Sequence, residues 1–177
     1  FAHTRRKNLL LRDLDELVNQ QLAKMLFANP QRIDYYDRYQ EIIDAYNAEQ
    51  NRATIEKTFM DLMELASSLD TEQQRYVREG FSSDEELSVY DLLFSENLTK
   101  QEIETIKKVS VDLLTKIKQQ IAKLDHWTDK QETKAIVDNL IRNTLWQELP
   151  NSYDVSDIQT YQKKIYEYVY MRYPEVA

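Results

Sequence analysis

The chain has 177 residues, of which 42% are hydrophobic, and a formal net charge of −8. One glycine and three prolines leave few positions for tight turns, which argues against phosphate-cradling loops and predicts an all-α fold. The lack of cysteine excludes disulfides and thiolate zinc sites, and the negative charge opposes sequence-independent binding to DNA or anionic membranes. With no apolar run long enough for a membrane span or a secretory signal, we expect a cytoplasmic protein.

Three helices are predicted in the first 80 residues. They cover 5–28, then 32 to about 47–51, then 53–69, with a kink or restart at Asp70-Thr71. Asn29-Pro30 ends the first helix, because the residue before proline is disfavoured in a helix. The predicted apolar stripes are Leu10, Leu14, Leu17, Leu22, Met25 and Leu26; Ile33, Tyr36, Tyr39, Ile43 and Tyr46, overlapped by Tyr35 and Ile42; and Ile55, Phe59, Met63 and Ala66.

Four further helices are predicted after Gly80, organised around the stretch 98–149. Ser83 with Glu86 opens a short helix that runs to about Phe94. The stretch 98–149 predicts two amphipathic helices joined by a corner at 125–127, and a last helix ends before Pro174. The predicted apolar residues of these three are Ile103, Ile106, Leu113, Leu114, Ile117, Ile121 and Leu124; Ile136, Leu140, Ile141 and Leu145; and Ile158, Tyr161, Ile165, Tyr168 and Val169.

Helix-capping signatures mark the starts of the last three helices. Thr99 and Glu102 form a capping box, and Thr128 with Gln131 repeats that signature. Asp154 is predicted to cap the last helix. The six or seven helices make either one bundle-like domain or two subdomains, 1–80 and 81–177, that meet near the helix terminator Gly80.

The sequence supports no catalytic motif. Asp129 with Glu132 and Lys134 superficially resembles the acidic-x-Lys core of metal-dependent nucleases, but all three fall in one helical first turn, where the acids complement the helix dipole. His3 and His126 stand far apart with no ligand spacing around them. We therefore expect a non-catalytic helical module without a metal or cofactor of its own.

A weakly basic stripe follows the first helix of the central pair. Lys107, Lys108 and Lys116 lie along it, with Lys118 and Lys123 nearby. Such charge patterns are most often a solvated helix face, which is the favoured interpretation. Contact of Lys107, Lys108 and Lys116 with duplex DNA is the alternative.

Three segments in order resemble the C-terminal helical region of the restriction (motor) subunit of type I restriction–modification enzymes. The first is the Arg-x-Asp-Tyr-Tyr helix, the second the Tyr-Asp-x-Leu segment, and the third the Trp-Thr corner followed by an amphipathic helix. The resemblance covers about residues 31–173. The family-like positions, expected to serve structure or docking, are Arg32, Asp34, Tyr35, Tyr36, Leu87, Tyr90, Asp91, Leu93, Trp127 and Thr128.

The resemblance implies a tail on a larger subunit that carries an N-terminal nuclease and an ATP-driven DNA translocase. In such a subunit ATP and Mg²⁺ belong to the other domains, and the tail docks the motor onto the methyltransferase and specificity subunits. A chain that begins with Phe1 is expected to be a fragment. DNA would be engaged through the whole complex. Two alternatives stay open: direct guidance of duplex DNA, and an unrelated cytoplasmic helical adaptor.

Overall fold

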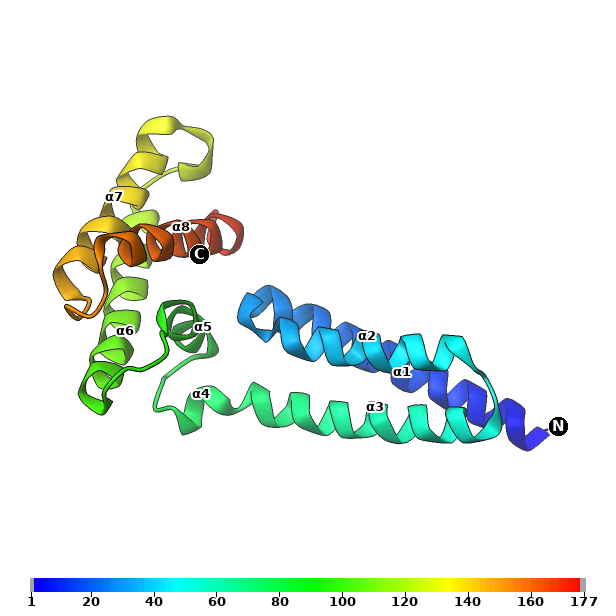
Figure 1. Ribbon diagram of the computed structural model, residues 1–177. Helices are drawn as coiled ribbons and strands as arrows, with labels where there is room; N and C mark the ends of the chain where they lie inside the picture. The colour runs from blue at the N-terminus through cyan, green and yellow to red at the C-terminus, as the bar shows by residue number, and fades with distance from the viewer. Residues whose placement is uncertain (1, 176–177) are drawn as a thin grey trace. The chain divides into compact units, whose positions relative to one another are not determined.

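The computed structural model describes residues 2–175, with side chains from residue 6 onward. Within these residues the chain forms eight α-helices, two short 3-10 helices and no strand, which confirms the all-α class (Figure 1). The chain divides into two compact units, Phe1–Gly80 and Phe81–Ala177. No helix of the described part combines the length and the apolar character needed to cross a membrane.

Unit 1 is built from three long helices, each of which runs in the direction opposite to the one before it (Figure 1). They are α1 (Ala2–Ala28), α2 (Ile33–Ala48) and α3 (Arg52–Gln73), with a 3-10 turn at Pro30–Arg32 and a short α4 at Arg75–Arg78 (Figure 1). Asn51 caps α3, because its side-chain oxygen accepts the Thr54 N–H at 2.9 Å. Both α1 and α2 pack on α3 and touch each other much less.

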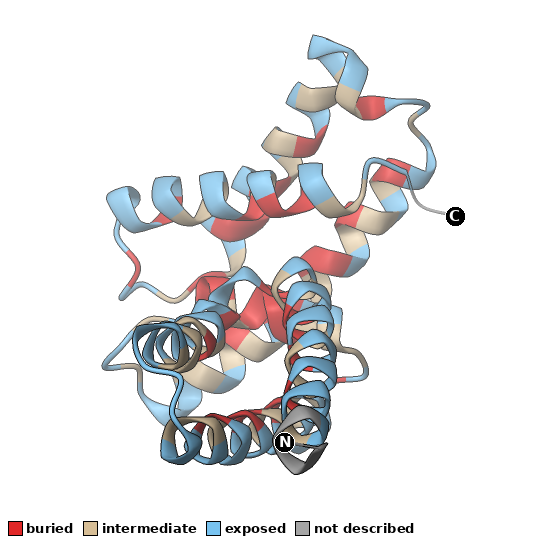
Figure 2. Ribbon diagram, turned by 90° about the vertical axis from the view of Figure 1, so that its right-hand side faces the viewer, coloured by how far each residue is buried: buried red, intermediate tan, exposed pale blue. Residues whose placement is uncertain are grey.

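The core of unit 1 follows the predicted stripes of α1 and α3 only in part, because Leu14, Ile55 and Ala66 pack against it while other predicted residues are exposed. Its buried members are Leu11, Val18, Leu22, Met25, Tyr39, Leu62, Leu65 and Leu69. Leu22 and Met25 confirm part of the prediction, whereas Leu10, Leu17 and Met63 are 52%, 65% and 52% exposed. The prediction was wrong there because α1 and α3 each carry two adjacent apolar stripes, and only one can face the core (Figure 2).

The predicted kink at Asp70-Thr71 does not occur. The α3 helix continues to Gln73, and the Thr71 hydroxyl donates to the Ser67 carbonyl one turn back. The interruption falls at Gln74, after which α4 adds a separate turn, so the structure has eight α-helices rather than six or seven. Gly80, with φ of +85°, takes the left-handed conformation expected of a helix terminator.

Unit 2 contains α5 (Asp84–Leu93), α6 (Lys100–Ala122), α7 (Gln131–Glu148) and α8 (Val155–Arg172). The long α6 packs against α5 and α7, and α8 packs on α7 and α5. Apolar side chains from all four helices meet in its core. The fully buried ones include Leu87, Leu93, Ile106, Leu113, Ile117, Ile121, Val137, Ile141, Leu145, Ile165 and Val169. Val137 takes the place predicted for Ile136, which is 42% exposed.

Two of the three predicted caps of the last helices are confirmed. Thr99 and Glu102 form the capping box of α6, and Asp154 forms one with Asp157 at the start of α8. The predicted Thr128 cap is wrong. His126 has a φ of +46° and Trp127–Asp129 forms a 3-10 turn, so Thr128 lies inside the turn.

The start of α7 is instead held by Thr133. Its hydroxyl lies 2.6 Å from the Trp127 carbonyl and 3.0 Å from the Lys130 carbonyl, and it can donate to either. The helix begins at Gln131 without a side-chain cap. The corner between α6 and α7 is therefore fixed from within α7.

Candidate functional site

The Arg32 and Tyr35 of the family-like first segment belong to a buried polar network around Glu72. The Arg32 guanidinium Nε donates to Glu72 Oε1 at 3.1 Å, Arg75 Nε donates to the same carboxylate at 3.0 Å, and the Tyr35 hydroxyl lies 3.4 Å from Oε2. Burial alone would raise the pKa of Glu72, but the hydrogen bonds from Arg75 and Arg32 lower it. The carboxylate is therefore held in its charged form.

This network ties three elements of unit 1 together. A second nitrogen of Arg32 donates to the Met25 carbonyl in the last turn of α1 at 3.4 Å, while Glu72 lies at the end of α3. Arg32 is 3% exposed, so its side chain is used inside the unit. Its role in the structure is to fix the turn between α1 and α2.

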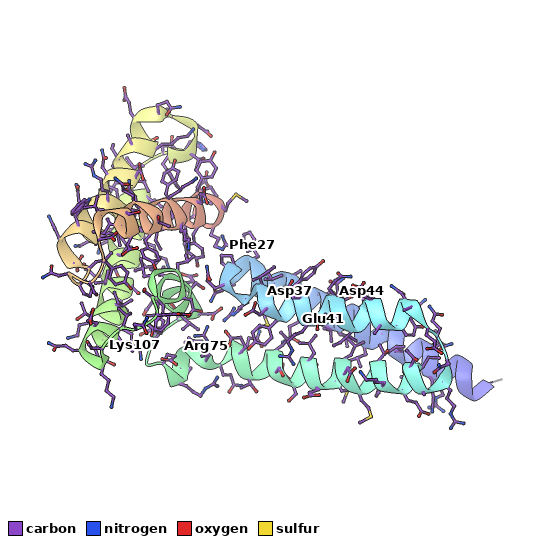
Figure 3. The ribbon with its side chains drawn as sticks, in the orientation of Figure 1. Phe27, Asp37, Glu41, Asp44, Arg75 and Lys107 are labelled. Carbon is purple, nitrogen blue, oxygen red and sulfur yellow. The ribbon has the colours of Figure 1, made fainter. Side chains whose placement is uncertain are left out.

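Asp34 and Tyr36, in contrast, lie on the surface of α2. Asp34 sits in the first turn of the helix, where a carboxylate is favourable. Tyr36 is 38% exposed and its ring lies 6.3 Å from that of Tyr39. Three further acids follow Asp34 along the exposed side of α2: Asp37, Glu41 and Asp44 (Figure 3).

The Tyr90 and Asp91 of the second segment lie in α5. Tyr90 is buried between the rings of Phe81 and Phe94, whose centroids lie 5.5 and 5.8 Å from its own. The Lys107 ammonium lies 5.9 Å from the same ring. Asp91 is half-buried. Tyr90 thus serves the core of unit 2.

Trp127 of the third segment is fully buried at the corner between α6 and α7. Its indole Nε1–H donates to the Tyr173 carbonyl at 2.7 Å, just beyond α8. The rings of Tyr166 and Tyr170, both on α8, meet the indole edge-on at 6.1 and 5.8 Å. Trp127 therefore joins the corner to the last helix, while Thr128 beside it is half-buried.

Lys116 and Lys118 of the basic stripe pair with acids. Lys116 lies 2.9 Å from Asp112 and 3.2 Å from Glu148, and its pKa is raised chiefly by the hydrogen bond with Asp112. Lys118 pairs with Glu85. Lys108 is exposed on the same helix. The pairs of Lys116 and Lys118 reduce the positive charge that α6 offers for phosphate contacts.

The nuclease-like triplet shows no converging geometry. Asp129 and Glu132 are exposed at the start of α7, and the Lys134 ammonium lies 6.0 Å from the centre of the Tyr170 ring. His126 Nδ1 lies 3.3 Å from Glu175. His3 is outside the residues whose side chains are described. Among those described, no three His, Asp or Glu residues are placed to hold a metal ion.

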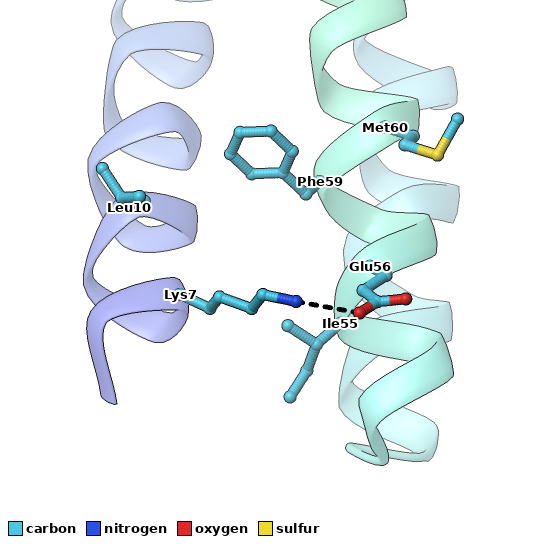
Figure 4. Close-up of a pocket in the computed structure, with 6 residues that line it drawn as sticks. All are labelled: Lys7, Leu10, Ile55, Glu56, Phe59 and Met60. Atoms are coloured by element: carbon cyan, nitrogen blue, oxygen red, sulfur yellow. Dashed lines mark hydrogen bonds and ion pairs between the residues drawn. The ribbon is translucent and has the colours of Figure 1, made fainter. Parts of the chain in front are cut away.

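Sequence reasoning missed an apolar hollow of about 370 Å³ between α1 and α3, because it took the lining residues for core (Figure 4). Leu10, Ile55, Phe59 and Met60 line it. The Lys7–Glu56 ion pair, at 2.9 Å, closes one end. Such an open, mainly apolar hollow is suited to contact with another apolar surface.

The hollow is the start of a longer strip, which we call the α1–α3 seam. Two polar contacts bracket the seam: Lys7 with Glu56, and Gln21 with Asp70 at 3.2 Å. Both contacts join residues 49 apart, so α1 and α3 run parallel in constant register. Between them lie the exposed apolar residues of the seam, which are Leu10, Leu17, Phe59, Met60 and Met63. Leu14 and Ala66, on the same helices, are half-buried and pack against the core of unit 1.

Comparison with known proteins identifies the family. A family model for the C-terminal region of "Type I restriction enzyme HindI endonuclease subunit-like" proteins matches residues 1–173. No curated protein and no solved structure shows significant similarity to the chain. Because the family model covers nearly the whole sequence, the chain belongs to the C-terminal domain family of type I restriction endonuclease subunits.

Proposed function

We propose that this chain is a non-catalytic assembly module of a cytoplasmic type I restriction complex. In this role it docks the ATP-dependent motor and nuclease subunit onto the methyltransferase and specificity subunits. Family membership supplies the multi-subunit context. The observation that carries the proposal is the α1–α3 seam, an apolar strip that the helices of its own unit leave exposed.

The polar residues of the chain support a scaffold better than a reaction centre. The Glu72 network and the Trp127 corner are both occupied by contacts within their own units. All buried side-chain nitrogen and oxygen atoms of the described part have hydrogen-bond partners. An active site would instead be expected to hold poised polar groups in a cleft.

Direct guidance of duplex DNA by α6 is less well supported. It would rest on Lys107, Lys108 and Lys116, yet Lys116 is shared by two carboxylates and Lys107 lies against the Tyr90 ring. Charge reversal of Lys108 distinguishes the two functions. Salt-sensitive DNA binding by the chain that this substitution weakens would favour DNA guidance over docking.

The docking function is tested by deletion of residues 1–177 from the endonuclease subunit. The truncated and intact subunits are compared for binding to the purified methyltransferase–specificity core and for DNA-stimulated ATPase activity. We expect core binding to weaken by at least about 100-fold, or roughly 2.7 kcal/mol, because the docking surface is removed. Retained ATPase activity would show that the motor is still folded, whereas unchanged core binding would refute the function.

A further inference from the structure

The α1–α3 seam has an apolar character that unit 1 does not use fully. On α1, Tyr39 of α2 reaches the flank that carries Asp15, where its hydroxyl donates at 2.6 Å. The seam occupies a different flank of α1, with Leu10 and Leu17 more than half exposed. A helix with so wide an apolar arc is typical of one that packs against two neighbours at once. On its seam side α1 packs against α3. The described helices of unit 1 leave room beside these two helices for one more.

The length and shape of the seam suit an α-helix. Its bracketing contacts are 14 residues apart on both helices, since Lys7 and Gln21 pair with Glu56 and Asp70. At 1.5 Å per residue this spans about 21 Å, or nearly four helical turns. An amphipathic helix meets such a groove with apolar residues at i, i+3 or i+4, and i+7. Met60 and Met63 on the rim are flexible side chains that adapt to a partner surface.

The charges at one end of the seam indicate the direction in which a helix bound there would run. The first turns of α1 and α3 contain no acidic residue, unlike those of α2, α5, α6, α7 and α8. At this end of the seam Lys7 and Arg52 share the single carboxylate of Glu56, and Arg6 is exposed beside Lys7. Cations at a helix N-terminus are unfavourable unless negative charge lies nearby. The Lys7–Arg52 end of the seam therefore favours an acidic group from outside.

We propose that the α1–α3 seam binds an amphipathic α-helix of the methyltransferase–specificity core, antiparallel to α1 and α3, with an acidic C-terminal end on Lys7 and Arg52. This inference rests on the proposed docking function and names the surface that performs it. The antiparallel direction sets the negative end of the bound helix dipole against two positive helix ends. The bound helix completes a four-helix arrangement with α1, α2 and α3.

The apolar part of the proposal is tested by two adjacent leucines in the intact endonuclease subunit. Leu10 lines the seam and Leu9 does not, although the two are 52% and 49% exposed. We expect Leu10→Asp to weaken binding to the methyltransferase–specificity core about tenfold or more, because it places a carboxylate in an apolar contact. Leu9→Asp is the control and should bind within about twofold of wild type. Circular dichroism of both variants checks that they fold alike.

The charged part is tested by a second matched pair on α3. Arg52 lies at the seam end and is 85% exposed on its side chain, and Lys57, paired with Asp61, is 76% exposed. Arg52→Glu should weaken core binding about threefold at low salt, with the loss fading as salt rises, and Lys57→Glu should have no effect. Arg52→Glu puts an acid into the first turn of α3, which favours the helix, but it also faces Glu56 one turn on with a like charge. Circular dichroism of both variants therefore checks that they fold alike.

The outcomes separate this inference from the function on which it rests. If the wild-type subunit binds the core and Leu10→Asp binds equally well, docking stands and the seam assignment is overturned. If the wild-type subunit fails to bind the core, both are overturned. If sedimentation shows that the subunit self-associates and Leu10→Asp abolishes only that association, the occupant is a second copy and the proposed partner is wrong.

Discussion

The two units differ in the side chains that fill their cores and in the charges at the starts of their long helices. Unit 2 gathers aromatic side chains around buried Trp127 and begins each long helix with an acidic residue in its first turn. Unit 1 builds its core from one stripe of α1 and α3, leaves a second stripe exposed, and begins both helices without acids. The comparison shows that two all-α units of one chain can differ in the charges at their helix starts and in the side chains that fill their cores. Four substitutions test how far that difference extends.

The largest effect is expected at the corner of unit 2. Trp127→Ala removes a fully buried indole, its hydrogen bond to Tyr173 and two edge-on ring contacts. We expect the free energy of unfolding to fall by about 4 kcal/mol. Urea denaturation followed by circular dichroism measures the loss. Trp146→Ala, at a 49% exposed site, is the control. An equal loss of stability there would show that the burial and contacts of Trp127 add no particular stability.

The next effect separates the two stripes of α3. Leu62→Ala empties a fully buried site in the core of unit 1 and should cost about 3 kcal/mol. Met63→Ala changes the next residue, which lies on the seam and is 52% exposed, and should cost no more than about 0.5 kcal/mol. Thermal denaturation of both variants makes the comparison. Similar losses would mean that the seam is part of the core after all.

A smaller loss is expected at the buried charges of unit 1. Glu72→Gln leaves the Arg32 guanidinium buried without its counter-charge. Breaking a buried pair costs roughly 3–5 kcal/mol, but Arg75 is 27% exposed and relaxes into water, so we expect about 2 kcal/mol. Urea denaturation at neutral pH gives the value. Glu64→Gln, on the exposed side of α3, should leave stability unchanged.

The same substitution carries a pH signature. The pKa of Glu72 is lowered in the folded state, so its contribution to stability is complete above the ordinary glutamate pKa of about 4.3 and is lost as pH falls through the folded-state value. The stability gap between wild type and Glu72→Gln should therefore stay constant down to about pH 5 and narrow below about pH 4. A gap that stays constant into strong acid would contradict the charged network.

The smallest effect concerns helix starts in unit 2. Thr99→Ala removes the hydroxyl that accepts the Glu102 N–H at 3.1 Å and should cost about 1 kcal/mol. Thr128→Ala, at the position wrongly predicted to cap α7, should cost less than about 0.5 kcal/mol. Thermal denaturation distinguishes the two. Equal losses of stability in the two variants would indicate that Thr128 caps α7, as the sequence predicted.

Local signals were enough to predict much of the fold. The helix caps at Thr99 and Asp154 need only residues three apart, and the terminator Gly80 needs only its own backbone freedom, so the capping box of Thr99, the cap at Asp154 and the terminator were predicted from the sequence. The prediction that Thr128 caps α7 was wrong because His126 adopts a left-handed conformation, which shifts the start of α7. No local sequence pattern predicts that turn.

The candidate site was harder to predict than the fold. Leu10 and Phe59 carry the right spacing for a core, and only the packing of α1, α2 and α3 decides which stripe of a doubly apolar helix faces inward. The Glu72 network joins residues 40 apart in the sequence, as between Arg32 and Glu72, which periodicity cannot reveal. The family motifs singled out Arg32 and Trp127, whereas their burial emerged only with the structure.

The aromatic corner of unit 2 also gives the molecule a spectroscopic label. The chain has two tryptophans, Trp127 and Trp146, and both lie in unit 2, while unit 1 contains only tyrosines and phenylalanines among its aromatic residues. Indole emission therefore reports on one unit alone. Trp127 is buried beside tyrosine rings, whereas Trp146 is half exposed to solvent. The fluorescence of Trp127 should therefore have its maximum at a shorter wavelength than that of Trp146. Recorded beside the far-ultraviolet signal, which both units share, this emission distinguishes melting of unit 2 from melting of unit 1 in the unlabelled protein.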